Sequence, residues 1–130
     1  MSYSIHIITS LNLGGTENFL SNLISMSDKK KHIVVSLKKK TANDVIFDKN
    51  VNVIYLNFSR NFFLNLFQII KLYKILKNTN FSSLNLWLYH SYLLGSLLSI
   101  RKKNRKIIWH VRCNYRLYKK NLSSMLNLYL

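Results

Sequence analysis

Two adjacent glycines followed by an acid form the first segment of this 130-residue chain whose residue types could do chemistry. Residues 11–17 read LNLGGTE, and Gly14 and Gly15 lack the side chains that would keep a ligand away from the backbone. A helix that begins after them directs its free N–H groups outward, where a phosphate or a sugar hydroxyl can dock beside Glu17. The pair is also typical of an ordinary tight turn, so both interpretations stay open.

A histidine among aromatic residues forms the second candidate segment. Residues 87–91 read WLYHS, and we expect them at the end of a strand, on the lip of a crevice. There His90 could hydrogen-bond a sugar hydroxyl or carry a proton near neutral pH. A histidine beside aromatic residues is, taken alone, more often a packed core residue with satisfied hydrogen bonds.

The third candidate segment is residues 109–113 (WHVRC), which we expect to end a strand. Strand alternation places His110 and Arg112 on the face opposite Trp109. Arg112 could fork onto a phosphate or carboxylate, or it could form an ordinary surface ion pair. Cys113 has no evident base nearby in sequence, so we expect it to be inert.

Residue counts and missing motifs exclude several kinds of site. The four acids are scattered, which argues against acid–base chemistry by two local carboxylates; they are Glu17, Asp28, Asp44 and Asp48. Neither the GxGxxG dinucleotide pattern nor the GxxxxGK[ST] phosphate loop occurs. Lysines 38–40 stand where a dinucleotide-binding domain would carry an acid, and such a run is most often a solvated loop.

Charge is the most unusual feature of the composition. Twenty Lys and Arg residues against four Asp and Glu give a net charge of +16, which favours phosphates, acidic polymers or an anionic membrane face as partners. The abundance of Lys, Asn, Ile, Tyr and Phe could equally reflect nucleotide bias in a genome. The single cysteine rules out a disulfide framework and favours a reducing, cytoplasmic setting.

Hydrophobic periodicity predicts alternating strands and helices. The expected strands are short β-branched or apolar runs, at residues 4–10, 32–37, 51–57, 82–90 and 106–113. The expected helices cover residues 16–28, 62–77, 92–100 and 123–130. We expect Thr16 to cap the first helix through its hydroxyl, and the helix over 62–77 to be packed because it is apolar over much of its surface.

This order predicts one α/β domain, a Rossmann-like parallel sheet of about five strands with helices on both faces, because parallel neighbours need long crossover connections. Ligands then bind at the carboxyl ends of the strands, where the strand order reverses. The start of the chain lacks the basic region of a signal peptide. The most apolar run, residues 84–100, is too short and too polar to span a bilayer.

Taken in this order, four segments resemble the N-terminal domain of family-4 retaining glycosyltransferases of GT-B fold. The segments are ITSLNLGGTE, HIVVSL, LWLYHSYLLGSLLS and IIWHVR, and together they span nearly the whole chain. The combination of a Gly-Gly loop with a following Glu and a WxYHxxxLG segment is fairly specific. The resemblance implies a sugar transferase in which this domain binds the acceptor and a C-terminal domain binds the nucleotide sugar.

The resemblance also implies roles for single residues. Gly14, Gly15 and Glu17 would lie against the donor phosphates and the acceptor. The implied acceptor contacts are Trp87, Tyr89, His90 and Arg112, although many relatives carry His where this chain has Arg112. No metal and no cofactor of its own are expected, only a nucleotide-sugar donor for the full-length enzyme.

The donor domain expected from the resemblance is absent from these 130 residues, so we expect a domain incomplete at its C-terminal end and inactive alone. The implied setting is assembly of polysaccharide or lipopolysaccharide on sugar or lipid-linked acceptors, with peripheral contact to the inner face of an anionic cell membrane. The alternative is a basic nucleic-acid or polyanion binding module that uses RKKNRK at residues 101–106, although no specific nucleic-acid motif supports it.

Overall fold

The computed structural model describes residues 2–27, 31–99 and 106–111, and within them it shows a five-stranded, all-parallel sheet. The strand order is β3-β2-β1-β4-β5, so β1 lies at the centre. The strands are β1 (Tyr3–Ile8), β2 (His32–Ser36), β3 (Asn52–Tyr55), β4 (Phe81–Trp87) and β5 (Lys106–His110). The α/β architecture expected from the sequence is confirmed.

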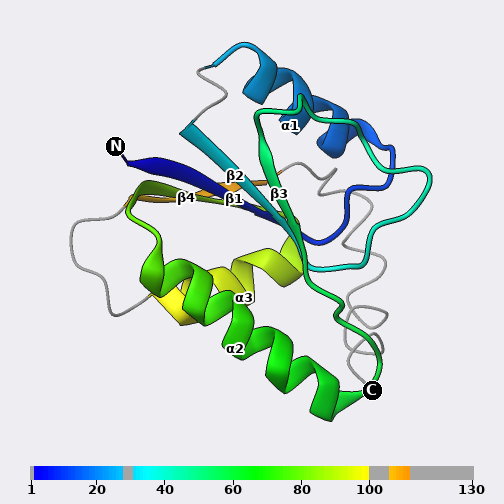
Figure 1. Ribbon diagram of the computed structural model, residues 1–130, viewed down its shortest axis with the longest axis vertical. Helices are drawn as coiled ribbons and strands as arrows, with labels where there is room; N and C mark the ends of the chain where they lie inside the picture. The colour runs from blue at the N-terminus through cyan, green and yellow to red at the C-terminus, as the bar shows by residue number, and fades with distance from the viewer. Residues whose placement is uncertain (1, 28–30, 100–105, 112–130) are drawn as a thin grey trace.

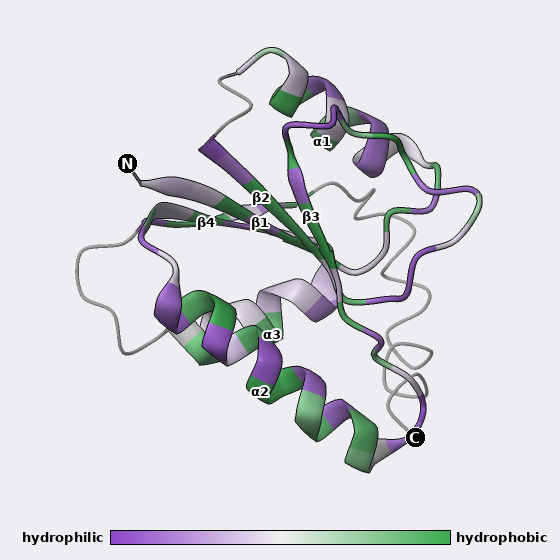
Figure 2. Ribbon diagram, in the orientation of Figure 1, coloured by the Kyte–Doolittle hydropathy of each residue, from purple (hydrophilic) through white to green (hydrophobic). Residues whose placement is uncertain are grey.

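Helices cover both faces of the sheet. One face carries α1 (Gly15–Ser25), and the other carries α2 (Phe62–Asn78) and α3 (Tyr89–Ser99) (Figure 1). Each connection between neighbouring parallel strands thus has the length a crossover needs. Figure 2 shows hydrophobic colour along the inner strands, between the two helical layers, as burial on both faces requires.

The core consists of two hydrophobic clusters, one on each side of the sheet. The cluster beneath α2 and α3 includes Ile5, Ile7, Leu84 and Leu86. The cluster beneath α1 is made by Ile8, Leu11, Leu20, Ile24, Val34, Val51 and Trp87. Alternate residues of β1 and β4 therefore supply the two clusters, in keeping with the two-residue period of a strand.

Three local expectations were wrong. The N-cap of α1 is Gly14 and not Thr16, which lies inside the first turn. The fourth strand ends at Trp87, because Leu88 has a positive φ of 69° that breaks the extended chain. Tyr89 and His90 consequently lie in the first turn of α3 and not in the strand.

The third wrong expectation concerns α2. Asn61 caps this helix, since its side chain accepts hydrogen bonds from the backbone N–H groups of Phe63 and Leu64. Only its second half is packed as expected, through the buried Leu72 and Leu76, whereas the first half carries several exposed apolar side chains. The helix expected over residues 123–130 lies outside the described residues.

Candidate functional site

The strand order reverses at the carboxyl ends of β1 and β4. From β1 the chain passes to α1 on one face of the sheet, and from β4 it passes to α3 on the other (Figure 1). In parallel sheets this divergence is where ligands bind. Because α1 and α3 both begin at this edge, the structure brings Gly15 and His90 to the same end of the sheet.

The two glycines of the loop after β1 have different surroundings. A Cβ atom at Gly14 would lie 2.6 Å from Oε2 of Glu17, whereas a Cβ at Gly15 would meet open space. Gly14 has an extended φ of −162°, so close contact and not backbone conformation explains its lack of a side chain. Gly15 is the position where a ligand can approach without displacing protein atoms.

The Glu17 carboxylate occupies space beside Gly14 at the amino end of α1. The residue is only 8% exposed, and a negative charge there is stabilised by the positive end of the helix. Among the described residues no hydrogen-bonding partner of this carboxylate is seen. A phosphate that docks against Gly14, as the resemblance implies, must therefore displace Glu17 or bind beside Gly15.

A loop that the sequence analysis did not single out holds the glycine loop in place. Backbone hydrogen bonds of 2.8 Å join Leu13 N to Asn43 O and Val45 N to Leu11 O. The Thr41 hydroxyl lies 2.6 Å from Oδ1 of Asn12 and 2.6 Å from Oδ1 of Asp44, and it can donate to either. The Asp44 carboxylate thus holds this loop together through hydrogen bonds.

Asp44 also raises the pKa of a neighbouring phenol. The pKa of Tyr55, at the end of β3, is raised by burial, by the charge of Asp44 and by a hydrogen bond to that carboxylate. A phenol whose proton is held in this way donates to Asp44 across the neutral pH range. This pair further fixes the loop that supports Gly14.

His90 is half-buried in the first turn of α3. Burial lowers its pKa, and the positive charge of Lys38 lowers it further. Lys38 follows β2, and its backbone N–H donates to Thr9 O over 3.0 Å, which places Lys38 beside the end of β1. His90 is therefore a neutral imidazole at pH 7, with one donor and one acceptor nitrogen on its ring.

The backbone before His90 is strained. A positive φ is unfavourable for a leucine, and Leu88 adopts it between the end of β4 and the start of α3. The buried Ser91 hydroxyl lies within hydrogen-bonding distance of the carbonyls of Trp87 and Leu88, and Tyr92 N donates to Leu88 O. These hydrogen bonds stabilise the turn between β4 and α3. No sequence pattern predicted this turn.

Trp87 is fully buried, so it has no surface to offer an acceptor as the resemblance implied. Its indole stacks on the ring of His110 with a centroid distance of 3.7 Å and an interplanar angle of 3°. Tyr89 is only partly buried, and its ring packs edge-on against Tyr92. Trp87 therefore supports the end of β4 from inside the core, and Tyr89 and His90 are the residues that can reach a ligand.

A chain of hydrogen-bonded rings crosses the α1 face of the sheet, and it was not anticipated. Trp87 Nε1–H donates to Nδ1 of His6 over 3.3 Å, so Nδ1 of His6 carries no proton. His6 Nε2–H can then donate to Nδ1 of His32 over 3.0 Å, and His32 Nε2–H to the Ser27 hydroxyl over 2.8 Å. Each hydrogen bond therefore fixes which ring nitrogen carries the proton in the next one.

Protonation of His6 is strongly disfavoured. Burial above all, together with the positive charges of His32 and His110, lowers the pKa of His6 to about 3. On the other side of Trp87, His110 Nε2 lies 3.0 Å from Oδ1 of Asn85. The sequence signal that could have revealed these hydrogen-bonded rings is the presence of a histidine in each of three different strands, at His6, His32 and His110.

Two residues of the third candidate segment are not among those that the structure describes. Arg112 and Cys113 lie outside the described residues, as does most of the basic stretch 101–106. Within residues 2–27, 31–99 and 106–111, no group of three His, Cys, Asp or Glu side chains could hold a metal ion. None of the helices in this part of the chain is long and apolar enough to cross a membrane.

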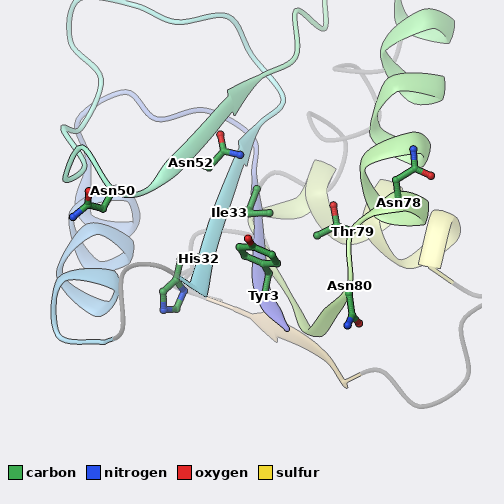
Figure 3. A pocket seen from close by; sticks show the side chains of 8 residues that line it. All are labelled: Tyr3, His32, Ile33, Asn50, Asn52, Asn78, Thr79 and Asn80. Atoms are coloured by element: carbon green, nitrogen blue, oxygen red, sulfur yellow. The ribbon is translucent and has the colours of Figure 1, made fainter. Parts of the chain in front are cut away.

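A cavity of about 390 Å³ opens at the opposite, amino-terminal end of the sheet. Figure 3 shows that its walls come from the starts of strands and from the turn between α2 and β4. Its lining residues are Tyr3, His32, Ile33, Asn50, Asn52, Asn78, Thr79 and Asn80. Amide groups dominate this surface, and it is separated by the length of the sheet from the reversal of strand order.

Comparison with known proteins identifies one related family. A family model described as glycosyl transferase 4-like matches residues 15–125, which is most of the chain and includes α1, the whole sheet after β1, and α3. A search of curated proteins finds no match.

Proposed function

Because the chain belongs to the glycosyl transferase 4-like family, we propose that it forms the acceptor-binding half of a sugar transferase of GT-B architecture. The enzyme would move a sugar from a nucleotide-sugar donor to an acceptor that is a polysaccharide or a lipid-linked sugar. The edge of the sheet at the ends of β1 and β4 would face the transfer reaction.

The observation that carries this proposal is the neutral imidazole of His90 at the reversal of strand order. A sugar hydroxyl both donates and accepts hydrogen bonds, and a neutral imidazole can meet it in either way. Burial and Lys38 keep the ring neutral, so His90 suits an uncharged hydroxyl better than a phosphate.

Positive charge for a phosphate is available at the same edge. Lys38 follows β2, and the amino end of α1 presents free N–H groups beside Gly15. We propose that a phosphate-bearing ligand reaches Gly15, where a side chain would meet open space, while Glu17 stays over Gly14.

Transfer also needs stabilisation of the departing nucleoside diphosphate, usually by several positive groups. Lys38 and one helix end are a sparse set for that task. We therefore propose that a second Rossmann-like domain binds the donor and that residues 1–130 alone turn over little or no nucleotide sugar.

A binding experiment tests the proposed site directly. Amide chemical shifts of the chain are followed during titration with oligosaccharides and with a short-chain lipid-linked sugar diphosphate. We expect shifts at Gly15, Lys38 and His90, and their loss in His90→Ala. The matched control is Asn78→Ala in the amino-terminal cavity, which should bind like the wild type. Shifts confined to Asn50 and Asn78 would contradict the proposed site.

A transfer assay tests the proposed division of labour. The isolated chain is incubated with a panel of nucleotide sugars and the same acceptors, and the released nucleoside diphosphate is measured. No release above background is expected. Robust turnover by the isolated chain would show that it binds both substrates and would refute the two-domain proposal.

A further inference from the structure

Among the described residues, the first half of α2 contributes no side chain to either buried hydrophobic cluster. Its second half is anchored by the buried Leu72 and Leu76, which belong to the cluster beneath the sheet. In Figure 1 the helix runs from that anchored end, near β4, to an end that extends beyond the sheet. Between Phe63 and Ile70, no described side chain is buried.

The side chains of this half are nevertheless large and apolar. Phe63 is 74% exposed and Phe67 is 68% exposed, and they lie one turn apart on the same side of the helix. The α2 face, as we define it, consists of the exposed apolar residues Phe63, Leu64, Leu66, Phe67, Ile70 and Tyr73. A contiguous exposed apolar patch of this kind marks an interaction surface.

Positive charge borders the α2 face, and negative charge is absent from it. Lys71 and Lys74 are exposed, and at 100° per residue they lie in the same arc of the helix as Phe63 and Phe67. Arg60 is exposed just before the helix begins. No Asp or Glu follows Asp48 anywhere in the sequence, so no acid of this helix or its flanking loops offsets these cations.

We propose that the α2 face docks on an anionic lipid bilayer. The apolar first half of the helix enters the boundary between headgroups and acyl chains, and Lys71, Lys74 and Arg60 contact the phosphates around it. Charge complementarity selects this partner, because an apolar surface bordered only by cations requires an anionic surface that can also take up aromatic rings. The packed second half, with Leu72 and Leu76, holds the domain to the docked helix.

Vesicle binding tests the proposal. The chain is sedimented with vesicles of phosphatidylcholine alone and of phosphatidylcholine mixed with phosphatidylglycerol, at low and high salt. We expect binding to the mixed vesicles that weakens with salt, since the lipid charge attracts the lysines. Phe63→Ser combined with Phe67→Ser should weaken the partition coefficient by about tenfold or more. Lys71→Gln and Lys74→Gln should each weaken it by about fivefold.

Matched variants distinguish binding through the α2 face from nonspecific binding through any exposed apolar side chain or any lysine. Met26 and Ile46 are as exposed as the two phenylalanines, and Lys39 and Lys49 are exposed lysines of other segments. Met26→Ser with Ile46→Ser, and Lys39→Gln with Lys49→Gln, should bind vesicles like the wild type. The circular dichroism spectrum of every variant should match that of the wild type, because all these side chains are exposed.

Insertion depth gives a second readout that does not depend on loss of binding. A tryptophan introduced by Phe67→Trp should be quenched by brominated lipids, and one introduced by Met26→Trp should not. Three results would overturn the proposal: vesicle binding unchanged in the double phenylalanine variant, equal loss in the control variants, or self-association of the chain that this variant abolishes without any vesicle binding. None of these measurements involves a sugar, so their failure would leave the proposed function untouched.

Discussion

The two faces of the sheet are built from alternate residues of the same strands, but they follow different rules. Toward α2 and α3 the central strands present only apolar side chains, such as Ile5, Ile7 and Leu84. Toward α1, the residue between the two isoleucines is His6, which is 2% exposed and hydrogen-bonded to two other rings. Burial of apolar surface, which has no preferred direction, stabilises the face beneath α2 and α3. Hydrogen bonds, which are directional, fix the positions of the rings on the face beneath α1. The difference teaches that the buried core on the α1 face should respond to protons, whereas the buried apolar core beneath α2 and α3 should not.

The largest expected effect is therefore a pH dependence that arises at His6. Its pKa is lowered from 6.5 to about 3 in the fold, so the unfolded chain takes up a proton below pH 6.5 that the folded chain refuses. The contribution of His6 to the free energy of unfolding is fully present above pH 6.5 and is lost as the pH falls toward 3. At 1.36 kcal/mol per pKa unit, this loss reaches up to about 5 kcal/mol. Urea unfolding at a series of pH values measures this loss.

A paired variant assigns that pH dependence. His6→Gln keeps polar groups beside Trp87 and His32 but has no ring to protonate, so most of the slope between pH 6.5 and pH 4 should disappear. His90 is more exposed and its pKa is lowered less, so His90→Gln should keep most of the slope. If His6→Gln kept the full slope, the distinction between the two faces would not hold.

On the face beneath α2 and α3, stability should depend on the volume of the buried side chains and not on pH. Leu84 is fully buried between the sheet and the helices, and Leu84→Ala should lower the free energy of unfolding by about 2–5 kcal/mol through lost burial and a residual cavity. Its loss should be the same at pH 7 and pH 5, measured in urea. A loss that grew as the pH fell would mean that the two faces are coupled through the strands.

Close packing on that face can be probed in the other direction. A Cβ atom at Gly95 of α3 would overlap with the Cδ atoms of Leu86, which is fully buried and has little room to move. Gly95→Ala should cost about 1–3 kcal/mol despite the better helix propensity of alanine. In the Leu86→Ala background the same change should become neutral or stabilising, as a double-mutant cycle in thermal unfolding would reveal.

The smallest expected effect lies at the end of the ring chain. Ser27 Oγ lies 2.8 Å from Nε2 of His32 and donates to Ile24 O over 3.0 Å, on the exposed side of the fold. Ser27→Ala should cost about 0.5–1 kcal/mol, because water can replace most of what the hydroxyl provides. A nuclear magnetic resonance titration of His32 should show a changed tautomer balance, whereas Ser25→Ala should leave it unaltered.

The fold was predictable because its strands are marked so clearly. Short β-branched runs such as HIVVSL have no helical period, and the long segments between them fit crossover helices. Strand ends were less predictable, since nothing in WLYHS shows that Leu88 will adopt a positive φ and place His90 on a helix. Local backbone strain is imposed by tertiary contacts, so periodicity does not record it.

The place of two candidate segments in the fold was predictable, but their local structure was not. The sequence marks the segments after β1 and β4 as candidates for ligand binding, and the strand order brings the ends of these two strands together. The burial of Trp87 and the carboxylate of Glu17 over Gly14 depend on neighbours from distant segments. The exposure of the first half of α2 was not predicted for the same reason, because an apolar pattern does not say which positions become buried.

The central position of β1 also governs the order of assembly as the chain is made. Its register joins Ile5 to Ile33 of β2 on one side and to Leu84 of β4 on the other. At roughly 5–20 residues per second of synthesis, β1 and β2 wait several seconds with one apolar edge open before β4 emerges. A nascent chain of this protein is thus most exposed to aggregation just before its fourth strand is complete, and a chaperone that shields strand edges would matter most in that interval.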